Sequence, residues 1–127
     1  MIRKMALVAL LAAAASGTLL AHHSYSAYDT TQTVSIEGTV VRVEYANPHV
    51  LLIFKSVDNE MEYSAEFPPA TSLRQTNFTA YSLKAGDIIV AKGSPMKDRE
   101  IHRISLMKEL RRPADGWLWN NQLQTPR

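Results

Sequence analysis

Apolar and polar residues alternate along two neighbouring segments, and this pattern predicts two β-strands at 33–46 and 50–57. In the first segment, apolar residues occupy even positions as far as Ile36 and odd positions from Val41 onward. The alternation therefore shifts by one residue near Gly38, as happens where an extra residue forms a β-bulge. We predict a bulge at Gly38 and a long, bent first strand, which suits a small closed barrel.

Three more strands and one short helix are predicted further along the chain: a strand at 60–67, a helix near 73–78 with Thr71 or Ser72 as its N-cap, and strands at 88–92 and 100–109. Pro68-Pro69 and Gly93-Ser94-Pro95 are predicted to end the third and fourth strands, because proline cannot donate to a sheet ladder.

The elements follow the order of an OB-fold, a small Greek-key barrel. The predicted fold class is all-β: a small OB-fold-like β-barrel of five strands, with one short helix between strands three and four. A plain five-stranded sandwich is the alternative.

The barrel is predicted to span 33–110, between an extended N-terminal arm at 22–32 and a polar C-terminal tail at 111–127. Trp117 and Trp119 lie in this tail and share a face if the tail is extended. We expect them to pack back onto the barrel, because two exposed tryptophans would favour aggregation.

Residues 1–21 have the pattern of a secretory signal peptide. Arg3 and Lys4 form a positive region, residues 5–15 are uninterruptedly apolar, and the small Ala21 precedes the predicted cleavage site. The apolar run is shorter than the roughly 18 residues of a membrane-spanning helix. We predict a bacterial protein that is periplasmic or secreted, with no membrane span in its mature form.

Charge and composition narrow the function classes. Removing Arg3 and Lys4 with the signal reduces the 14 Lys and Arg residues to 12, which equals the 12 Asp and Glu residues. An exported chain without net charge gives no electrostatic reason to bind nucleic acid. The absence of cysteine excludes disulfides, thiolate catalysis and iron–sulfur clusters, so a hydrophobic core must hold the domain together.

Several short motifs resemble one family. The chain resembles the exported bacterial family of unknown function called DUF6152, through the following segments: His22-His23-Ser24, Tyr28-Asp29, Gly38-Thr39-Val40, Tyr45-Ala46-Asn47-Pro48-His49, Leu83-Lys84-Ala85-Gly86-Asp87 and Gly93-Ser94-Pro95. The resemblance covers most of the mature chain. It implies the barrel fold and export, and it implies no activity.

Three histidines form the candidate metal site. Cleavage after Ala21 would make His22 the N-terminal residue, whose free amine and ring nitrogen can chelate one metal. His49, at the tip of the predicted Asn47-Pro48 turn, would supply a second imidazole, and His23 offers another route through the amine and backbone nitrogen. Such nitrogen donors suit Cu(II), so copper is the candidate cofactor. The alternative is that these histidines are ordinary surface residues. His102, on the predicted fifth strand, is the weakest ligand candidate.

OB-folds commonly bind ligands with the loops between strands one and two and between strands four and five. Here those loops contribute the ligand-binding candidates Asn47, His49, Lys97 and Arg99. The partners considered are a small molecule, a saccharide or a periplasmic protein, and no nucleic acid.

No spacing identifies a catalytic acid–base pair, and Ser24, His23 and Asp29 lie on one predicted arm with nothing to fix them as a hydrolase triad. The leading hypothesis is therefore a non-enzymatic, exported binding module, with a Cu(II)-type site at its mature N-terminus as one option. The alternative is a metal-dependent redox protein that uses the N-terminal histidine chelate.

Overall fold

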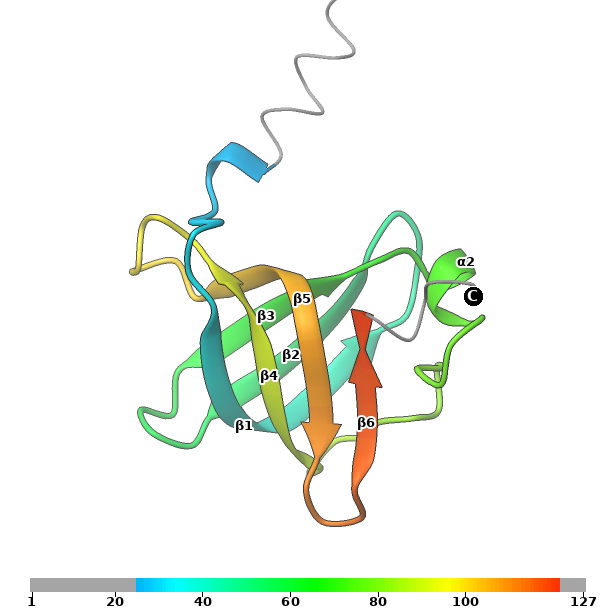
Figure 1. Cartoon of the computed structure of the whole chain (residues 1–127). Helices are drawn as coiled ribbons and strands as arrows, with labels where there is room; N and C mark the ends of the chain where they lie inside the picture. Colours follow the sequence, from blue (N-terminus) through cyan, green and yellow to red (C-terminus); the bar gives the residue numbers. More distant parts are fainter. Residues whose placement is uncertain (1–24, 122–127) are drawn as a thin grey trace, which may run out of the picture.

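The structure is a computed structural model and describes residues 25–121. Its elements, in chain order, are β1 (Val34–Glu44), β2 (Val50–Ser56), β3 (Glu62–Phe67), α2 (Ala70–Leu73), β4 (Ile88–Pro95), β5 (Arg103–Arg112) and β6 (Trp117–Asn120) (Figure 1). The predicted signal peptide, His22 and His23 lie outside the described residues.

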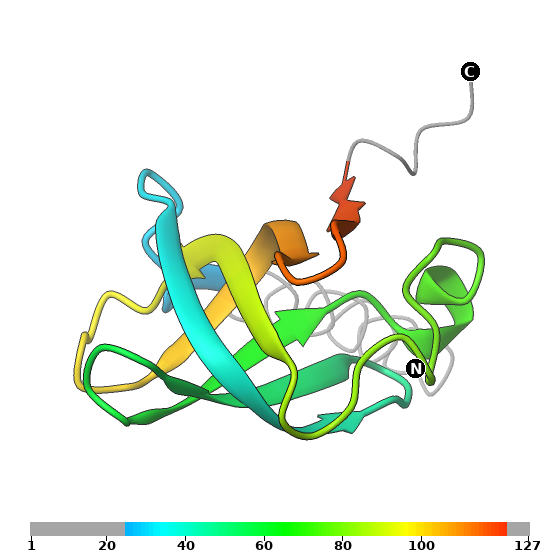
Figure 2. The same cartoon turned by 90° about the horizontal axis from the view of Figure 1, so that it is seen from below.

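The first five strands form a closed barrel, so the predicted fold class is confirmed. The hydrogen-bonded order is β3-β2-β1-β4-β5, and a parallel pairing of β3 with β5 closes the ring through Ser64–Arg103 and Ala65–Ile104. All other neighbouring strands pair antiparallel. This strand order is that of the OB-fold rather than of a two-sheet sandwich. In Figures 1 and 2, α2 lies on the side of the barrel next to β6.

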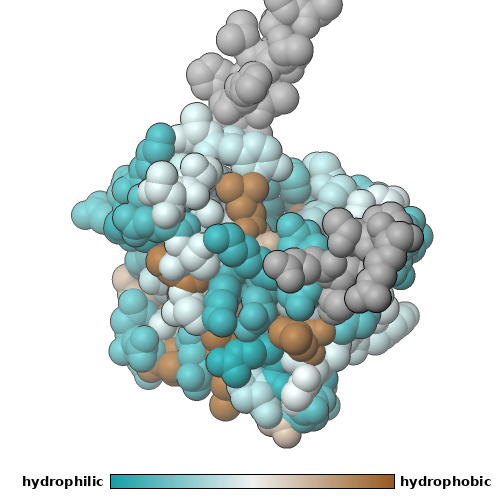
Figure 3. All heavy atoms as spheres, viewed as in Figure 1, coloured by the Kyte–Doolittle hydropathy of each residue, from teal (hydrophilic) through white to brown (hydrophobic). Residues whose placement is uncertain are grey.

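The core fills the barrel and extends toward α2 and β6. Its largest fully buried side chains are Trp119, Phe54, Phe67, Phe78, Leu52 and Leu73. On the face shown in Figure 3, over β4, β5 and β6, hydrophobic atoms appear as separate groups among hydrophilic ones. Cavities are therefore better candidates for a binding site than any broad apolar surface on that face.

The bulge of β1 lies at Val41 rather than at the predicted Gly38. Val40 pairs with Phe54 and Arg42 with Ile53, so Val41 is the extra residue. Gly38 serves a different purpose. A Cβ atom there would collide with the Phe54 ring and would lie 2.7 Å from the Lys55 carbonyl oxygen. The glycine therefore permits a close approach of β1 to β2, and the alternation shifts three residues later.

The predicted end of the fourth strand also needs correction. β4 does not stop before Gly93 but continues to Pro95, which pairs with Ile104 at the end of the ladder. This proline is tolerated because it is the last residue of its strand. The β4–β5 register shifts between Lys92 and Ser94, where β5 carries Leu106 at a φ of 50°. Such a local irregularity is invisible to a period-2 pattern.

The predicted polar tail at 111–127 is wrong in its described part. β5 continues to Arg112, and β6 then pairs with it antiparallel, with Leu110 opposite Trp119. Gly116, at a φ of 77°, allows the tight turn between them. Trp119 is fully buried, as expected for a tryptophan that packs back onto the barrel. The sequence pattern does not reveal this strand because it is only four residues long and only Trp119 in it is buried.

The segment between β3 and β4 is fixed by side chains from distant loops. The Asn47 side chain accepts a hydrogen bond from the Thr71 amide (3.2 Å), and the Tyr45 hydroxyl donates to the Phe78 carbonyl (2.8 Å). The helix α2 is a single turn that starts at Ala70, with no N-cap from Thr71 or Ser72, in contrast to the prediction. Its first turn is stabilised by Asn47, which no local sequence pattern can indicate.

Arg112 joins the β5–β6 turn to the loop before β4. Its guanidinium donates to both carboxylate oxygens of Asp115 (3.0 and 2.9 Å), to Asp87 (2.9 Å) and to the Ser82 carbonyl (2.7 Å). The ring of Trp117 lies beneath it, 5.7 Å from ring centre to guanidinium carbon. The hydrogen bond from Arg112 lowers the pKa of Asp115, and the Trp117 amide lowers it further.

We expect the Arg112→Gln variant to lose less stability than the wild type when the pH falls from 7 to 3. A carboxyl group whose pKa is lowered by folding stabilises the fold above its unfolded pKa of about 3.9, and this contribution disappears as the pH falls through the native pKa. Without Arg112 the native pKa of Asp115 returns toward the unfolded value. The difference in melting temperature between pH 7 and pH 3, measured by circular dichroism, should therefore shrink. Arg42→Gln, which removes the exposed Arg42–Glu44 pair, is the control and should leave that difference unchanged.

Candidate functional site

A cavity opens where β5 passes from one neighbouring strand to another. Within residues 25–121, β5 pairs with β3 through Arg103 and Ile104 and with β6 through 109–112, so residues 105–108 pair with neither strand. A cavity of about 370 Å³ lies at this gap. We call it the His49 cavity, and its lining includes Tyr25, His49, Glu66, Phe67, Met107 and Lys108. Its volume lies within the range of small-ligand sites, about 300–1,000 Å³.

His49 and Glu66 form part of the polar lining of the His49 cavity. His49 directly precedes β2, and the β2–β3 register places Val50 opposite Phe67 and Leu51 opposite Glu66. This register brings His49 Nδ1 to 3.5 Å from Glu66 Oε1. The imidazole is about half exposed, and Glu66 is mostly covered. Because Nδ1 faces the carboxylate, Nε2 is the nitrogen that is available to a ligand.

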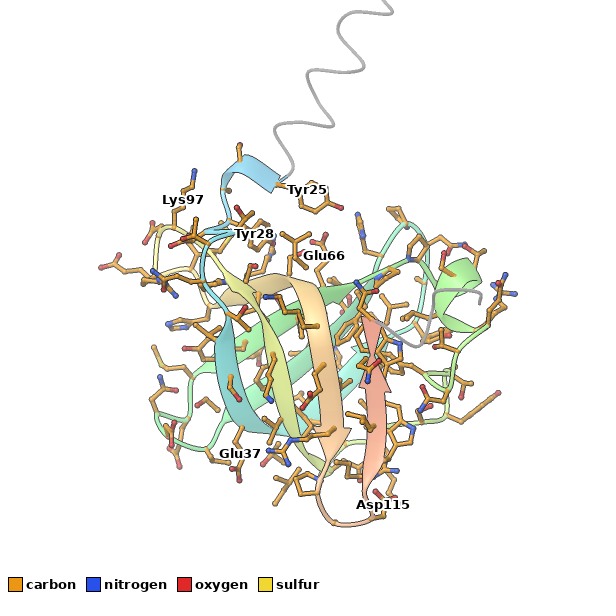
Figure 4. All side chains as sticks on the ribbon, viewed as in Figure 1. Tyr25, Tyr28, Glu37, Glu66, Lys97 and Asp115 are labelled. Carbon is orange, nitrogen blue, oxygen red and sulfur yellow. The ribbon has the colours of Figure 1, made fainter. Side chains whose placement is uncertain are left out.

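The N-terminal segment is held against the same end of the barrel. The Asp29 amide donates to the Pro95 carbonyl, and the Lys97 amide donates to the Ala27 carbonyl, both at 2.8 Å. These bonds fix the chain close to Tyr25, which lines the His49 cavity. Figure 4 shows Tyr25 and Glu66 at this end of the barrel. The first described residue therefore lies at the rim of the cavity that contains His49.

Tyr28 lies beneath this N-terminal segment as a buried polar group. Burial raises the pKa of the Tyr28 hydroxyl, and the negative charge of Glu66 raises it further. Hydrogen bonds with Arg103 and Ser105 act in the opposite direction. The hydroxyl thus stays protonated at neutral pH.

The structure separates the four predicted ligand-binding residues. His49 lines the cavity just described, whereas the side chain of its neighbour Asn47 is bonded to Thr71. Lys97 is exposed on the loop after β4, and Arg99 on the same loop donates to Gln32 (2.6 Å) and lines a different, smaller cavity. The two loops therefore do not form one site through these four side chains.

The described residues contain no complete metal site, because no three His, Asp or Glu side chains come together between residues 25 and 121. His102 is not part of the His49 cavity, and its ring packs 4.8 Å from that of Tyr63. His22 and His23 lie outside the described part of the chain. Tyr25 and Glu66, which also line the His49 cavity, are not among the residues that the sequence predicts for a site. Glu66 follows only from the register of β2 with β3, in which Val50, the residue after His49, pairs with Phe67, the residue after Glu66.

Comparison with protein families agrees with the resemblance seen in the motifs. The model of DUF6152, described as a family of unknown function, matches residues 9–105. The chain belongs to this family. The match covers β1 to β4 and the start of β5 in this DUF6152 protein, including His49 and Glu66. Comparison with curated proteins gives no match. In the described part of the chain, no helix has the length and apolar character needed to cross a membrane.

Proposed function

We propose that this DUF6152 protein is an exported, periplasmic binding module that holds a Cu(II)-type ion at the His49 cavity. The ligands would be the amine and ring nitrogen of an N-terminal His22 together with the imidazole of His49. The proposal is supported chiefly by one observation: Tyr25 and His49 line the same cavity.

The length of chain before Tyr25 is compatible with this site. An extended residue spans at most about 3.6 Å, so the three residues from Tyr25 back to His22 reach about 10 Å. Tyr25 and His49 both line the cavity. The proposal requires that this reach bring the amine of a mature chain that begins at His22 to the imidazole of His49. His23 would then lie between the chelating residue and the barrel.

The donor chemistry favours copper. One amine and two imidazole nitrogens are the donors that suit a planar Cu(II) site, with a water oxygen completing it. Glu66 Oε1 lies 3.5 Å from His49 Nδ1, and a carboxylate in this position orients a metal-binding imidazole and makes it a better ligand. Because the N-terminal amine must lose its proton to bind, affinity should rise as the pH increases through about 8.

The experiment begins with mass spectrometry of the protein purified from the periplasm, followed by Cu(II) titration of the same material. We expect a chain that starts at His22 and binds one Cu(II). One added alanine before His22 should remove the chelate, and His49→Ala should remove the second imidazole. Each change is expected to lower affinity at least about a hundredfold, and Glu66→Gln about ten- to a hundredfold.

His102→Ala is the matched control, because this histidine also lies on the barrel but packs against Tyr63 outside the His49 cavity. It should leave copper affinity unchanged. A chain that starts elsewhere than His22, or equal copper binding by the alanine-extended and wild-type proteins, would contradict the proposal. Binding that persists unchanged in His49→Ala would reduce the site to the N-terminal peptide alone.

A further inference from the structure

A second cavity lies at the end of the barrel where β1 and β5 begin and β4 ends. It measures about 200 Å³, and we call it the Arg99 cavity. Val34 and Ile36 of β1, Ile101 of the loop before β5 and Ile104 of β5 form its apolar wall. Arg99 and Arg103 also line it. Apolar side chains and two guanidinium groups therefore share one small cavity, which is separate from the His49 cavity.

Arg99 and Arg103 differ from the arginines of the barrel that form ion pairs. Arg42, Arg111 and Arg112 each have a carboxylate oxygen within 4.0 Å. Among residues 25–121, neither Arg99 nor Arg103 has such a partner. Their positive charges at the Arg99 cavity are therefore not neutralised by direct ion pairs.

Neutral groups hold these two guanidinium groups in place. Arg99 donates to the side-chain carbonyl of Gln32 (2.6 Å), and Arg103 donates to the Ser64 hydroxyl (3.3 Å) and is also bonded to the Tyr28 hydroxyl. A guanidinium has five N–H donors, so these contacts leave donors for an anion on each arginine. An arginine that is already oriented loses less conformational entropy when it binds a carboxylate.

The apolar wall of the cavity is incompletely covered. Val34, Ile36 and Tyr63 pack against the core but are only partly buried, and Ile101 is 46% exposed. A bound apolar group would remove this surface from water, with a gain of about 25 cal/mol for each Å² buried. The volume limits that group, because it equals about seven water molecules at about 30 Å³ each. A short carbon chain fits this space, whereas a polymer does not.

We infer that the Arg99 cavity binds a small organic carboxylate with a short apolar chain, the carboxylate facing Arg99 and Arg103 and the chain lying on Val34, Ile36 and Ile101. This binding is independent of the copper site. The cavity near Arg112 does not share this chemistry, since the Arg112 guanidinium already donates to two carboxylates and a carbonyl.

The test uses hexanoate as the probe and ¹⁵N-labelled mature protein in two-dimensional NMR. Hexanoate should cause saturable shifts of the amide signals of Ile36, Ile101 and Ile104. Hexanol and hexylamine have the same chain without the carboxylate, and each should bind at least about tenfold more weakly, as expected when a charge-assisted hydrogen bond is lost.

Two variants examine the two halves of the cavity. Arg99→Gln should weaken hexanoate binding about tenfold, and Ile101→Ser should weaken hexanoate and hexanol alike. Arg42→Gln, an exposed arginine on the same barrel that does not line this cavity, should have no effect. Equal affinities of wild type and Arg99→Gln, equal binding of hexanoate and hexanol, or shifts confined to other residues would overturn the inference. None of these outcomes depends on whether copper binds at His49.

Discussion

Replacing Trp119 with alanine is expected to lower the free energy of unfolding by about 3–5 kcal/mol, a large share of the stability of a domain of this size. Trp119 is fully buried, and its ring packs edge-on against Phe67 at 5.2 Å and Phe78 at 6.4 Å between ring centres. Alanine would leave a cavity where the core meets β6. Urea unfolding followed by circular dichroism gives the difference directly.

Two further variants separate loss of packing from loss of the strand. Leu118 lies on the opposite face of β6 and is 40% exposed, so Leu118→Ala should cost less than about 1 kcal/mol. Trp119→Phe should cost clearly less than alanine, because the buried indole N–H has no hydrogen-bond partner among the described residues and none is lost. If Trp119→Ala were as mild as Leu118→Ala, β6 would not belong to the folded core.

Gly38→Ala is expected to destabilise the barrel by about 3 kcal/mol, at the upper end of the usual cost of overpacking. The new methyl group would meet the Phe54 ring and lie 2.7 Å from the Lys55 carbonyl oxygen. A ring can shift, but the carbonyl is part of the β1–β2 ladder, in which Gly38 pairs with Ser56. The methyl group can therefore be accommodated only if the two strands separate locally.

A double-mutant cycle with Phe54→Leu tests this explanation. The smaller side chain removes the contact with the ring and leaves the contact with the carbonyl, so Gly38→Ala should cost less in this background, though still more than zero. Ser35→Ala, an exposed substitution on the same strand, should change stability by less than about 0.5 kcal/mol. Strict additivity of Gly38→Ala and Phe54→Leu would show that the ring is not the cause.

The candidate site was only partly predictable. His49 was identified because Asn-Pro marks a turn and a turn exposes its tip, both of which are local properties. Its partner Glu66 follows only from the pairing of β2 with β3. Asn47 was expected to bind a ligand, and its side chain is instead bonded to Thr71, which lies 24 residues away in the chain. Loop membership therefore did not indicate which way these neighbouring side chains face.

The two arginines of the Arg99 cavity illustrate the same limit. The sequence identified Arg99 as a basic loop residue, but the value of an arginine to a ligand depends on whether a carboxylate already pairs with it. Arg112 is neutralised by Asp87 and Asp115, whereas Arg99 and Arg103 have no such partner among residues 25–121. Only the folded positions of the acidic residues distinguish these cases.

Local patterns in the sequence are sufficient to predict the five barrel strands, one short helix between β3 and β4 and the resemblance to the DUF6152 family, because alternation, proline, glycine and short motifs act over a few residues. The bulge at Val41, the sixth strand and both cavities become evident only in the folded chain. Each of these depends on register, since a shift of one residue changes which side chains face each other across a ladder. Trp119, Glu66 and Arg103 acquire their roles only through pairings between residues that are distant in the chain.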